Sequence, residues 1–298
     1  MIDSETKKVK LSIIIAAWNN ADMLRRCLLS LTNQAASANA EVIVVSNFVN
    51  GLNEIKREFP FADYQILPCE TSIPELRTRG ILKSKGEIVA LSEDLCAFQA
   101  GWCEKIIQAH DSEFSIIGGG IENAENQSSL DWAVFLYDYG RYLPDDNASL
   151  TDALSEINIS YKRRILFDNS ETYRNGFSEI FVNNSLKAAG YKLLFLPAAV
   201  VTHYKNYAFS KIVLQFYQQA RHFAARRAAN SSGLNRFFFV SVSLFLPIIL
   251  TARVIRQTIR KNRFLSKLII SLPYLFILMN VWAFGEFCGY LLEDKLKK

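Results

Sequence analysis

The stretch Glu87-Ile-Val-Ala-Leu-Ser-Glu-Asp-Leu-Cys-Ala-Phe-Gln-Ala-Gly-Trp102 decides the fold of this chain. Its apolar part predicts a buried strand, which ends in the adjacent carboxylates Glu93 and Asp94 and then runs through a loop to Trp102. Open α/β sheets bind ligands beyond the carboxyl ends of their strands, where an acidic pair can hold a divalent cation against a phosphate. A solvated strand end without a ligand is the alternative.

Strands and helices alternate around this stretch. Such alternation predicts parallel βαβ units with right-handed crossovers, and hence an α/β fold with a doubly wound sheet. The first strand is not followed by G-x-G-x-x-G, which weakens a dinucleotide-binding interpretation. The predicted strands are 10–17, 41–46, 64–67, 87–91 and 114–121, and the predicted helices are 21–31, 53–59 and 72–85.

Length and charge set the frame for the rest of the chain. At 298 residues it can form one large α/β domain and an appendage. The net charge of +5 is uneven: residues from Lys205 onward include 15 basic and three acidic ones, whereas the first 204 residues include 19 basic and 26 acidic ones. Because the basic residues of the tail flank long apolar runs, they indicate anionic lipid as a partner and no nucleic acid. A solubilising surface is the weaker alternative.

The tail contains two apolar runs, at 237–252 and 268–292. The first is too short to span a bilayer comfortably and is interrupted by Pro247, while the second is long enough but contains Glu286. Basic residues on both sides of the first run predict that it lies in the interface or re-enters, with both chain termini cytoplasmic. A buried helical hairpin of a soluble protein is the alternative.

Cysteine usage and the N-terminus bear on the compartment. The five cysteines are scattered and form no C-x-x-C pair, so we expect reduced thiols and neither a disulfide framework nor a zinc site. The N-terminal residues include no apolar segment typical of a signal peptide. We therefore expect a membrane-associated protein whose catalytic domain is cytoplasmic.

Several motifs follow one another along the chain: Leu11-Ser-Ile-Ile-Ile-Ala-Ala-Trp-Asn-Asn20, the run from Leu76 through Gly86 to Leu91, the acidic turn before Gly101-Trp102, Asn158-Ile-Ser-Tyr-Lys-Arg163, Gly176-Phe-Ser-Glu179, Gly190-Tyr-Lys-Leu193 and Pro197 to His203. In this order they resemble family 2 glycosyltransferases of the GT-A fold. The resemblance covers about residues 10 to 205 and implies a doubly wound, mostly parallel, Rossmann-like sheet. It also implies a nucleotide-sugar donor, and the apolar tail resembles that of members acting on lipid-linked or other membrane-proximal glycan acceptors.

The resemblance and the tail together predict three parts. They are a glycosyltransferase domain at 1–208, a basic amphipathic interface helix at 209–236 and a membrane-associated helical hairpin at 237–298.

The donor site is expected at the ends of the first, second and fourth strands. The resemblance places donor contacts at Ala17, Trp18 and Asn19, and at Ser46 and Asn47, where the family usually has an aspartate. Ser and Asn can still form hydrogen bonds but carry no charge. The family's D-x-D turn becomes Glu93-Asp94-Leu95, whose third residue cannot bind metal. Glu93, Asp94 and His203 could still make an oxygen and nitrogen site for Mg²⁺ or Mn²⁺.

Transfer from a nucleoside diphosphate needs charge stabilisation on the leaving group and a base for the acceptor hydroxyl. Arg77 and Arg79 are candidates for the first task. For the second, Ser178-Glu179 stands where the resemblance expects the acidic pair that carries the base, which makes Glu179 the predicted base. A carboxylate that merely stabilises the start of its helix is the alternative.

Gln218-Gln-Ala-Arg221-His222 resembles the Q-x-x-R-W motif of processive membrane synthases, with His in place of Trp. The i, i+3 spacing puts Gln218 and Arg221 on one helical face, where they could contact the donor diphosphate or the acceptor. A basic helix lying on the membrane explains these residues as well. Two functions remain open: an inverting glycosyltransferase, and a non-catalytic, membrane-tethered relative that binds sugar nucleotides or acts as a scaffold.

Overall fold

The computed structural model describes residues 8–229 and 233–291. The chain forms two compact units. Of the described residues, 8–124 and 142–204 form the first unit. The second unit is formed by 125–141, 205–229 and 233–291. The helix α5 (Ser129–Tyr139) lies in the second unit, although the sequence places it in the middle of the α/β pattern.

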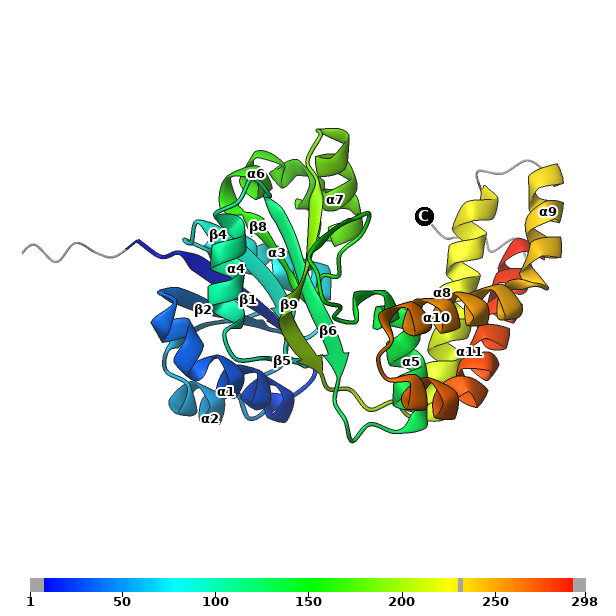
Figure 1. The fold of residues 1–298 in the computed structure, drawn as a ribbon, viewed down its shortest axis with the longest axis horizontal. Coiled ribbons are helices and arrows are strands. Elements are labelled where there is room, and N and C mark those ends of the chain that lie inside the picture. Colours follow the sequence, from blue (N-terminus) through cyan, green and yellow to red (C-terminus); the bar gives the residue numbers. More distant parts are fainter. Residues whose placement is uncertain (1–7, 230–232, 292–298) are drawn as a thin grey trace, which may run out of the picture. The chain divides into compact units, whose positions relative to one another are not determined.

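A nine-stranded sheet is the centre of the first unit, in the order β3-β2-β1-β4-β8-β6-β9-β5, with β7 paired to β9 (Figure 1). The first four strands are parallel, which confirms the doubly wound, mostly parallel α/β arrangement. Strand β8 is antiparallel to both β4 and β6, and β6 is parallel to β9. The strands are β1 (Leu11–Ala17), β2 (Ala40–Ser46), β3 (Ala62–Ile66), β4 (Ile88–Glu93), β5 (Cys96–Phe98), β6 (Ile116–Asn123), β7 (Ser149–Thr151), β8 (Ile159–Lys162) and β9 (Leu193–His203).

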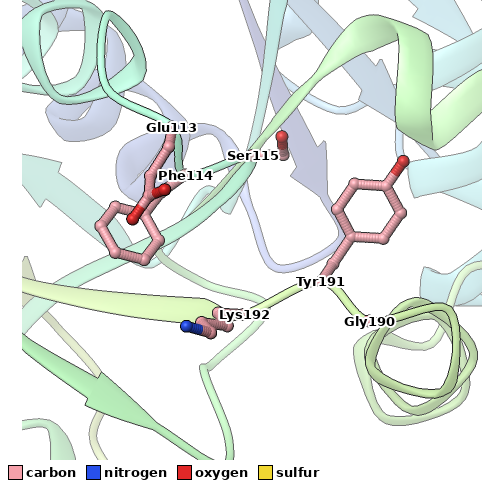
Figure 2. A pocket seen from close by; sticks show the side chains of 6 residues that line it. All are labelled: Glu113, Phe114, Ser115, Gly190, Tyr191 and Lys192. Carbon is pink, nitrogen blue, oxygen red and sulfur yellow. The ribbon is translucent and has the colours of Figure 1, made fainter.

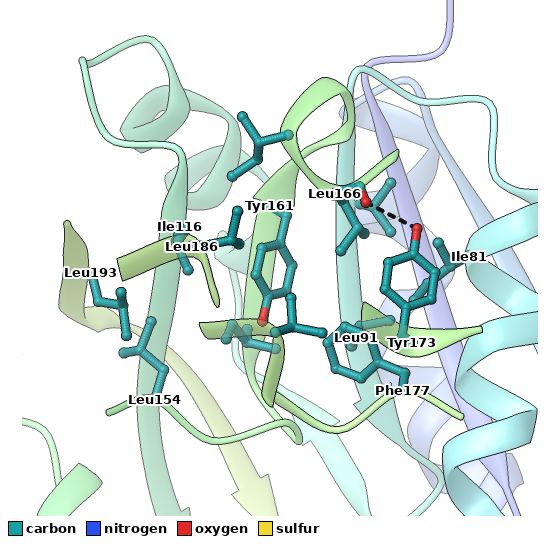
Figure 3. Close-up of a cluster of buried hydrophobic side chains, with 14 of the residues drawn as sticks. Ile81, Leu91, Ile116, Leu154, Tyr161, Leu166, Tyr173, Phe177, Leu186 and Leu193 are labelled. Carbon is teal, nitrogen blue, oxygen red and sulfur yellow. Dashed lines mark hydrogen bonds between the residues drawn. The ribbon is translucent and has the colours of Figure 1, made fainter. Parts of the chain in front are cut away.

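Helices cover both faces of this sheet (Figure 1). A core on one face joins strand residues such as Ile14 and Leu91 to residues of α3, α6 and α7, with the rings of Tyr161, Tyr173 and Phe177 at its centre (Figure 3). The helices of the first unit are α1 (Ala21–Ser37), α2 (Leu52–Glu58), α3 (Ile73–Lys83), α4 (Trp102–His110), α6 (Arg163–Asp168) and α7 (Glu179–Ala188), with 3₁₀ turns at Gly140–Tyr142 in the chain between the units and at Ser170–Tyr173.

The five strands and three helices predicted from the sequence correspond to β1, β2, β3, β4, β6, α1, α2 and α3, with shifts of up to six residues at their ends. Strands β5, β7, β8 and β9 were not predicted. Helix α1 continues to Ser37, six residues beyond the predicted end, because Cys27, Leu28 and Leu31 are followed by another buried position, Ala35. The acidic segment at 143–152, for which no strand was predicted, contains the short strand β7. Such a three-residue edge strand has no periodicity of its own to reveal it.

The glycine run in β6 allows a side chain to cross close to the strand. The amide of Asn158 donates to the carbonyls of Gly120 and Ala199, at 2.8 and 2.9 Å, and accepts a bond from the indole of Trp102 at 3.0 Å. A Cβ on Gly119 would collide with this amide. The bonds fix the segment before β8 against the sheet.

The second unit consists of α5 and the C-terminal helices α8 (Phe209–Ala229), α9 (Gly233–Ser243), α10 (Leu246–Lys261) and α11 (Leu265–Leu291). The short apolar run is not one helix, because α9 and α10 meet at a bend of 64°. Helix α11 is long and apolar enough to span a bilayer, but 39% of its apolar window is buried, and it packs along α8, α10 and α5. The predicted divisions at 208 and 236 stay predictions.

Candidate functional site

Asp94 is held at the point where β4 and β1 end side by side. Its Oδ2 accepts hydrogen bonds from the backbone N–H groups of Trp18 and Asn19, at 3.1 and 2.9 Å, and its Oδ1 accepts one from the Asn19 amide at 2.7 Å. The side chain is buried, and this burial raises the pKa of Asp94 to about 6, whereas the bonds from Asn19 lower it. The predicted turn after the fourth strand thus joins the predicted turn after the first.

Glu93, the residue before Asp94, has a different set of partners, apart from Trp18. One of its oxygens accepts a bond from the indole N–H of Trp18 at 3.1 Å, and the other forms a buried ion pair with Arg77 of α3. Burial raises the pKa of Glu93, while the Arg77 guanidinium opposes that rise. Arg77 lies 3.6 Å from a second carboxylate, that of Glu156 in the loop before β8. Its charge is therefore shared between carboxylates of the protein.

Glu179 begins α7 and is brought toward this group by the preceding loop. The N–H of Phe177 donates to the carbonyl of Pro74 in the first turn of α3, at 2.9 Å, and the hydroxyl of Thr78 donates to the carbonyl of Tyr173 at 3.2 Å. Burial raises the pKa of Glu179 to about 8, and the negative charge of Glu156 contributes to this rise. A role limited to stabilising the helix start would favour the ionised form instead.

The three predicted metal ligands do not form a preformed metal site. Among the described residues, no group of three or more His, Cys, Asp or Glu side chains is placed to hold a metal ion. The carboxylate oxygens of Asp94 accept hydrogen bonds from Asn19, and those of Glu93 accept one from Trp18 and pair with Arg77. His203 is buried at the end of β9, where it is paired in register with Cys96. A Mg²⁺ or Mn²⁺ ion held here would need ligands from the diphosphate, as is usual for Mg²⁺.

The other residues predicted to contact the donor do not all lie together. Ala17 and Ser46 are adjacent in register at the ends of β1 and β2, and the amide of Asn47 donates to the carbonyl of Thr71 at 2.9 Å. Arg79 does not join Arg77: its side chain is 51% exposed and pairs with Glu75 at 3.4 Å. Two residues along a helix is about 200°, so the two arginines point to opposite sides of α3.

Gln218 and Arg221 lie on α8 in the second unit, Gln218 exposed and Arg221 half-buried. The backbone of Arg221 lies against Gly285 and Gly289 of α11, so this part of α8 also serves in helix packing. Contact of the two side chains with a donor stays a prediction.

The residue that sequence reasoning missed is Glu156. It lies two positions before Asn158, and the antiparallel pairing of β8 with β4, with Ile159 opposite Leu91, brings it to the carboxyl end of β4. A carboxylate just before a buried strand is the only local signal. It does not become informative until the direction of that strand is known.

Two surface pockets of the first unit lie apart from these carboxylates. One, with a volume of about 180 Å³, is lined by residues 113–115 and 190–192, just before β6 and β9 begin (Figure 2). Because β6 runs in the same direction as β4, this pocket lies at the sheet edge opposite Glu93. The other, of about 480 Å³, lies between α1 and the start of α4 and includes Asn33 and Glu104.

The class of protein is indicated by three features: the order of strands, the paired carboxylates at the end of β4 and the carboxylate at the start of α7. Residues 12–166 match the sequence profile of glycosyl transferase family 2, which is more than half of the chain. The chain belongs to this family.

Two known proteins give the closer comparison. Glycosyltransferase AglE of Haloferax volcanii is 26% identical over 161 residues, which is 50% of this chain and 49% of that protein. The chain thus aligns with about half the length of this curated relative. The structure of mannosyltransferase PcManGT from Pyrobaculum calidifontis, in complex with GDP-Man and Mn²⁺, is similar over 97% of this chain and 89% of that one, with a TM-score of 0.53 and 12% identity. This similarity supports the GT-A fold.

Proposed function

We propose that this protein is an inverting glycosyltransferase that moves a sugar from a nucleotide donor to a lipid-linked or membrane-proximal acceptor at the cytoplasmic face of a membrane. The observation that carries the proposal is the linked set of carboxylates in the first unit. Glu93 and Glu156 both pair with Arg77, and the charges of Arg77 and Glu156 both act on the Glu179 carboxyl. This linkage supports donor binding and proton acceptance at one site. Membership of the family supports a transferase with a nucleotide-sugar donor.

The reaction assigns each group one task. The acceptor oxygen attacks the anomeric carbon from the side opposite the leaving group, the bond from that carbon to the phosphate oxygen breaks, and the nucleoside diphosphate leaves with the electron pair. The acceptor hydroxyl loses its proton to Glu179. Trp18 and Asn19, held by Asp94, shape the donor side of this site. A divalent cation would supply charge stabilisation on the diphosphate.

The second unit supports action at a membrane. Exposed apolar residues occur along α9, α10 and α11 and in the bend between α9 and α10, among them Phe237, Phe245, Ile248 and Ile269, each more than 60% exposed. Arg253, Arg256 and Arg260 are exposed on α10. Apolar side chains beside exposed arginines are typical of helices that lie in the interface of anionic membranes. Both termini are proposed to be cytoplasmic.

A non-catalytic relative is the second candidate. The uncharged Ser46-Asn47 segment and the lack of a three-ligand metal group among the described residues favour it.

Membranes containing the full chain should be incubated with a panel of radiolabelled nucleotide sugars, followed by extraction of lipids and glycans. GDP-mannose is the first donor to try, since the structurally similar mannosyltransferase binds GDP-Man. Transfer from one donor supports the enzyme, and tight nucleotide binding without transfer from any donor supports the relative.

A further inference from the structure

Trp18, the residue that follows β1, is held at two points. Its backbone N–H donates to Oδ2 of Asp94 and its indole N–H donates to Oε2 of Glu93, each at 3.1 Å. A tryptophan side chain turns about only two bonds, so fixing the backbone and one ring atom fixes the direction of the whole ring. The adjacent carboxylates at the end of β4 therefore set the orientation of one aromatic side chain.

The apolar part of the same ring is supported as well. Trp18 packs against a buried cluster from β1, β2 and α3 that contains Ala16, Ile43, Val45 and Leu76. The side chain is half-buried, so part of the ring is accessible to solvent. A fixed aromatic ring at the carboxyl edge of parallel strands suits a flat group such as a nucleobase, because every base has a face that can stack on it.

Arg77 holds Glu93 in turn. The Arg77 side chain is 6% exposed and forms a buried ion pair with Oε1 of Glu93. Both carboxylate oxygens of Glu93 thus have partners, the guanidinium at one and the Trp18 indole at the other. Other rotamers of Glu93 would leave a buried charge without its partner, which costs free energy. The connection from Arg77 through Glu93 to Trp18 joins α3, β4 and the turn after β1.

We propose that Glu93 and Arg77 are positioning residues that hold the Trp18 ring as one wall of the site for the donor's nucleoside, and that Glu93 acts through Trp18 and not as a metal ligand. This inference rests on the function proposed above. The two carboxylates then have separate tasks, since Asp94 holds the backbone of Trp18 and Glu93 holds its ring. Loss of the Glu93 charge should weaken nucleotide binding whether or not a metal ion is present.

A double-mutant cycle tests the coupling. Trp18→Phe removes the indole N–H but keeps an aromatic ring, and Glu93→Gln removes the charge that pairs with Arg77. We expect each change to weaken binding of UDP or GDP to the full chain by about tenfold, and the double variant to bind no more weakly than either single one, because both changes remove the same support. Glu87→Gln, at the exposed carboxylate just before β4, is the control and should leave the affinity unchanged.

These affinities should be measured by calorimetry in Mn²⁺ and again in EDTA. The loss in Glu93→Gln should be the same in both, whereas loss of a metal ligand would weaken binding only with Mn²⁺. A loss confined to Mn²⁺, or additive losses of about a hundredfold in the double variant, would overturn the positioning role.

A second measurement needs neither nucleotide nor turnover. In ¹⁵N NMR spectra of the full chain, the indole N–H signal of Trp18 is the one that is missing in Trp18→Phe. We expect hydrogen exchange at this group to become faster by about tenfold or more in Glu93→Gln and to stay unchanged in Glu87→Gln. If exchange responds in this way but no nucleotide binds, the hold on the ring stands and the proposed function fails. Equal exchange rates in Glu93→Gln and the unchanged chain would show that Glu93 does not hold the ring.

Discussion

Arg77 pairs with two carboxylates of the first unit, those of Glu93 and Glu156. The i, i+2 spacing of Arg77 and Arg79 makes them look equivalent in the sequence, yet one is buried between Glu93 and Glu156 and the other is exposed beside Glu75. Buried and exposed ion pairs differ strongly in what their loss costs, because a buried carboxylate left without its partner stays desolvated. The two arginines therefore form a matched experiment.

Arg77→Met should lower the free energy of unfolding by about 3 to 5 kcal/mol, while Arg79→Met should change it by less than about 1 kcal/mol. The loss in Arg77→Met should be larger at pH 8 than at pH 5, because the carboxyls left behind can take up protons at the lower pH. Urea unfolding at both pH values measures this. Similar losses in the two variants would show that Arg77 does not hold the carboxylates.

Glu179→Gln and Asp94→Asn should separate proton transfer from donor binding. The first keeps side-chain size but cannot accept the acceptor proton, so turnover should fall by about 10² to 10⁴ with nucleotide affinity preserved. Asp94→Asn should instead weaken nucleotide binding, with the larger effect when Mn²⁺ is present, because a carboxylate is lost beside the diphosphate. Transfer assays and calorimetry with UDP and GDP, in Mn²⁺ and in EDTA, distinguish these results. Near-normal transfer by Glu179→Gln would remove it as the base.

At the scale of elements, the packing of α11 on α8 depends on two glycines one turn apart. A Cβ on Gly285 would lie 2.6 Å from the carbonyl oxygen of Tyr217, and one on Gly289 would lie 2.7 Å from the Cβ of Ala224. Small residues at such spacing let two helix backbones approach closely. The sequence shows the glycines, but a run this apolar does not reveal which helix they face.

Gly289→Val should therefore separate α11 from α8 and destabilise the second unit by about 1 to 3 kcal/mol, the usual cost of overpacking. Gly140→Ala is the control, because a Cβ there meets only ordinary contacts, the nearest at 3.9 Å from Thr258. Limited proteolysis and melting temperature in detergent would report the difference. Equal behaviour of the two variants would mean that the close approach of the helices is not needed for stability.

At the scale of the whole molecule, charge and apolar exposure are divided between the two units. The basic residues of the second unit predict binding to anionic vesicles, and each one near the surface contributes about 1 kcal/mol. Arg256→Gln with Arg260→Gln should weaken flotation with phosphatidylserine vesicles by about tenfold or more, with little effect on neutral vesicles. Arg164→Gln, at an exposed arginine of the first unit, should change neither. Equal loss on both vesicle types would exclude the electrostatic contribution.

Protease digestion of sealed vesicles tests the topology of the same region. If both termini are cytoplasmic and the first apolar run does not cross the membrane alone, the protease should cut the segment 261–263 from the cytoplasmic side. Cleavage from the outer side only would show that the α9–α10 pair crosses the membrane.

The sequence by itself determined the alternating strands and helices, the buried strand ending in Glu93 and Asp94, and the family. Those features are local: hydrophobic period, turn residues and the order of short motifs are all written within a few residues of each other. It also indicated Glu179, through a motif at the start of a helix.

Only the tertiary structure decided that Arg77 and not Arg79 pairs with Glu93 and Glu156, that the charge of Glu156 acts on Glu179, and that α5 packs with the C-terminal helices. Residues 77, 93, 156 and 179 meet because β8 enters the sheet antiparallel beside β4 and the loop before α7 is bonded to the first turn of α3. Pairing over such sequence distances is set by the closure of the whole core. No local pattern carries that information.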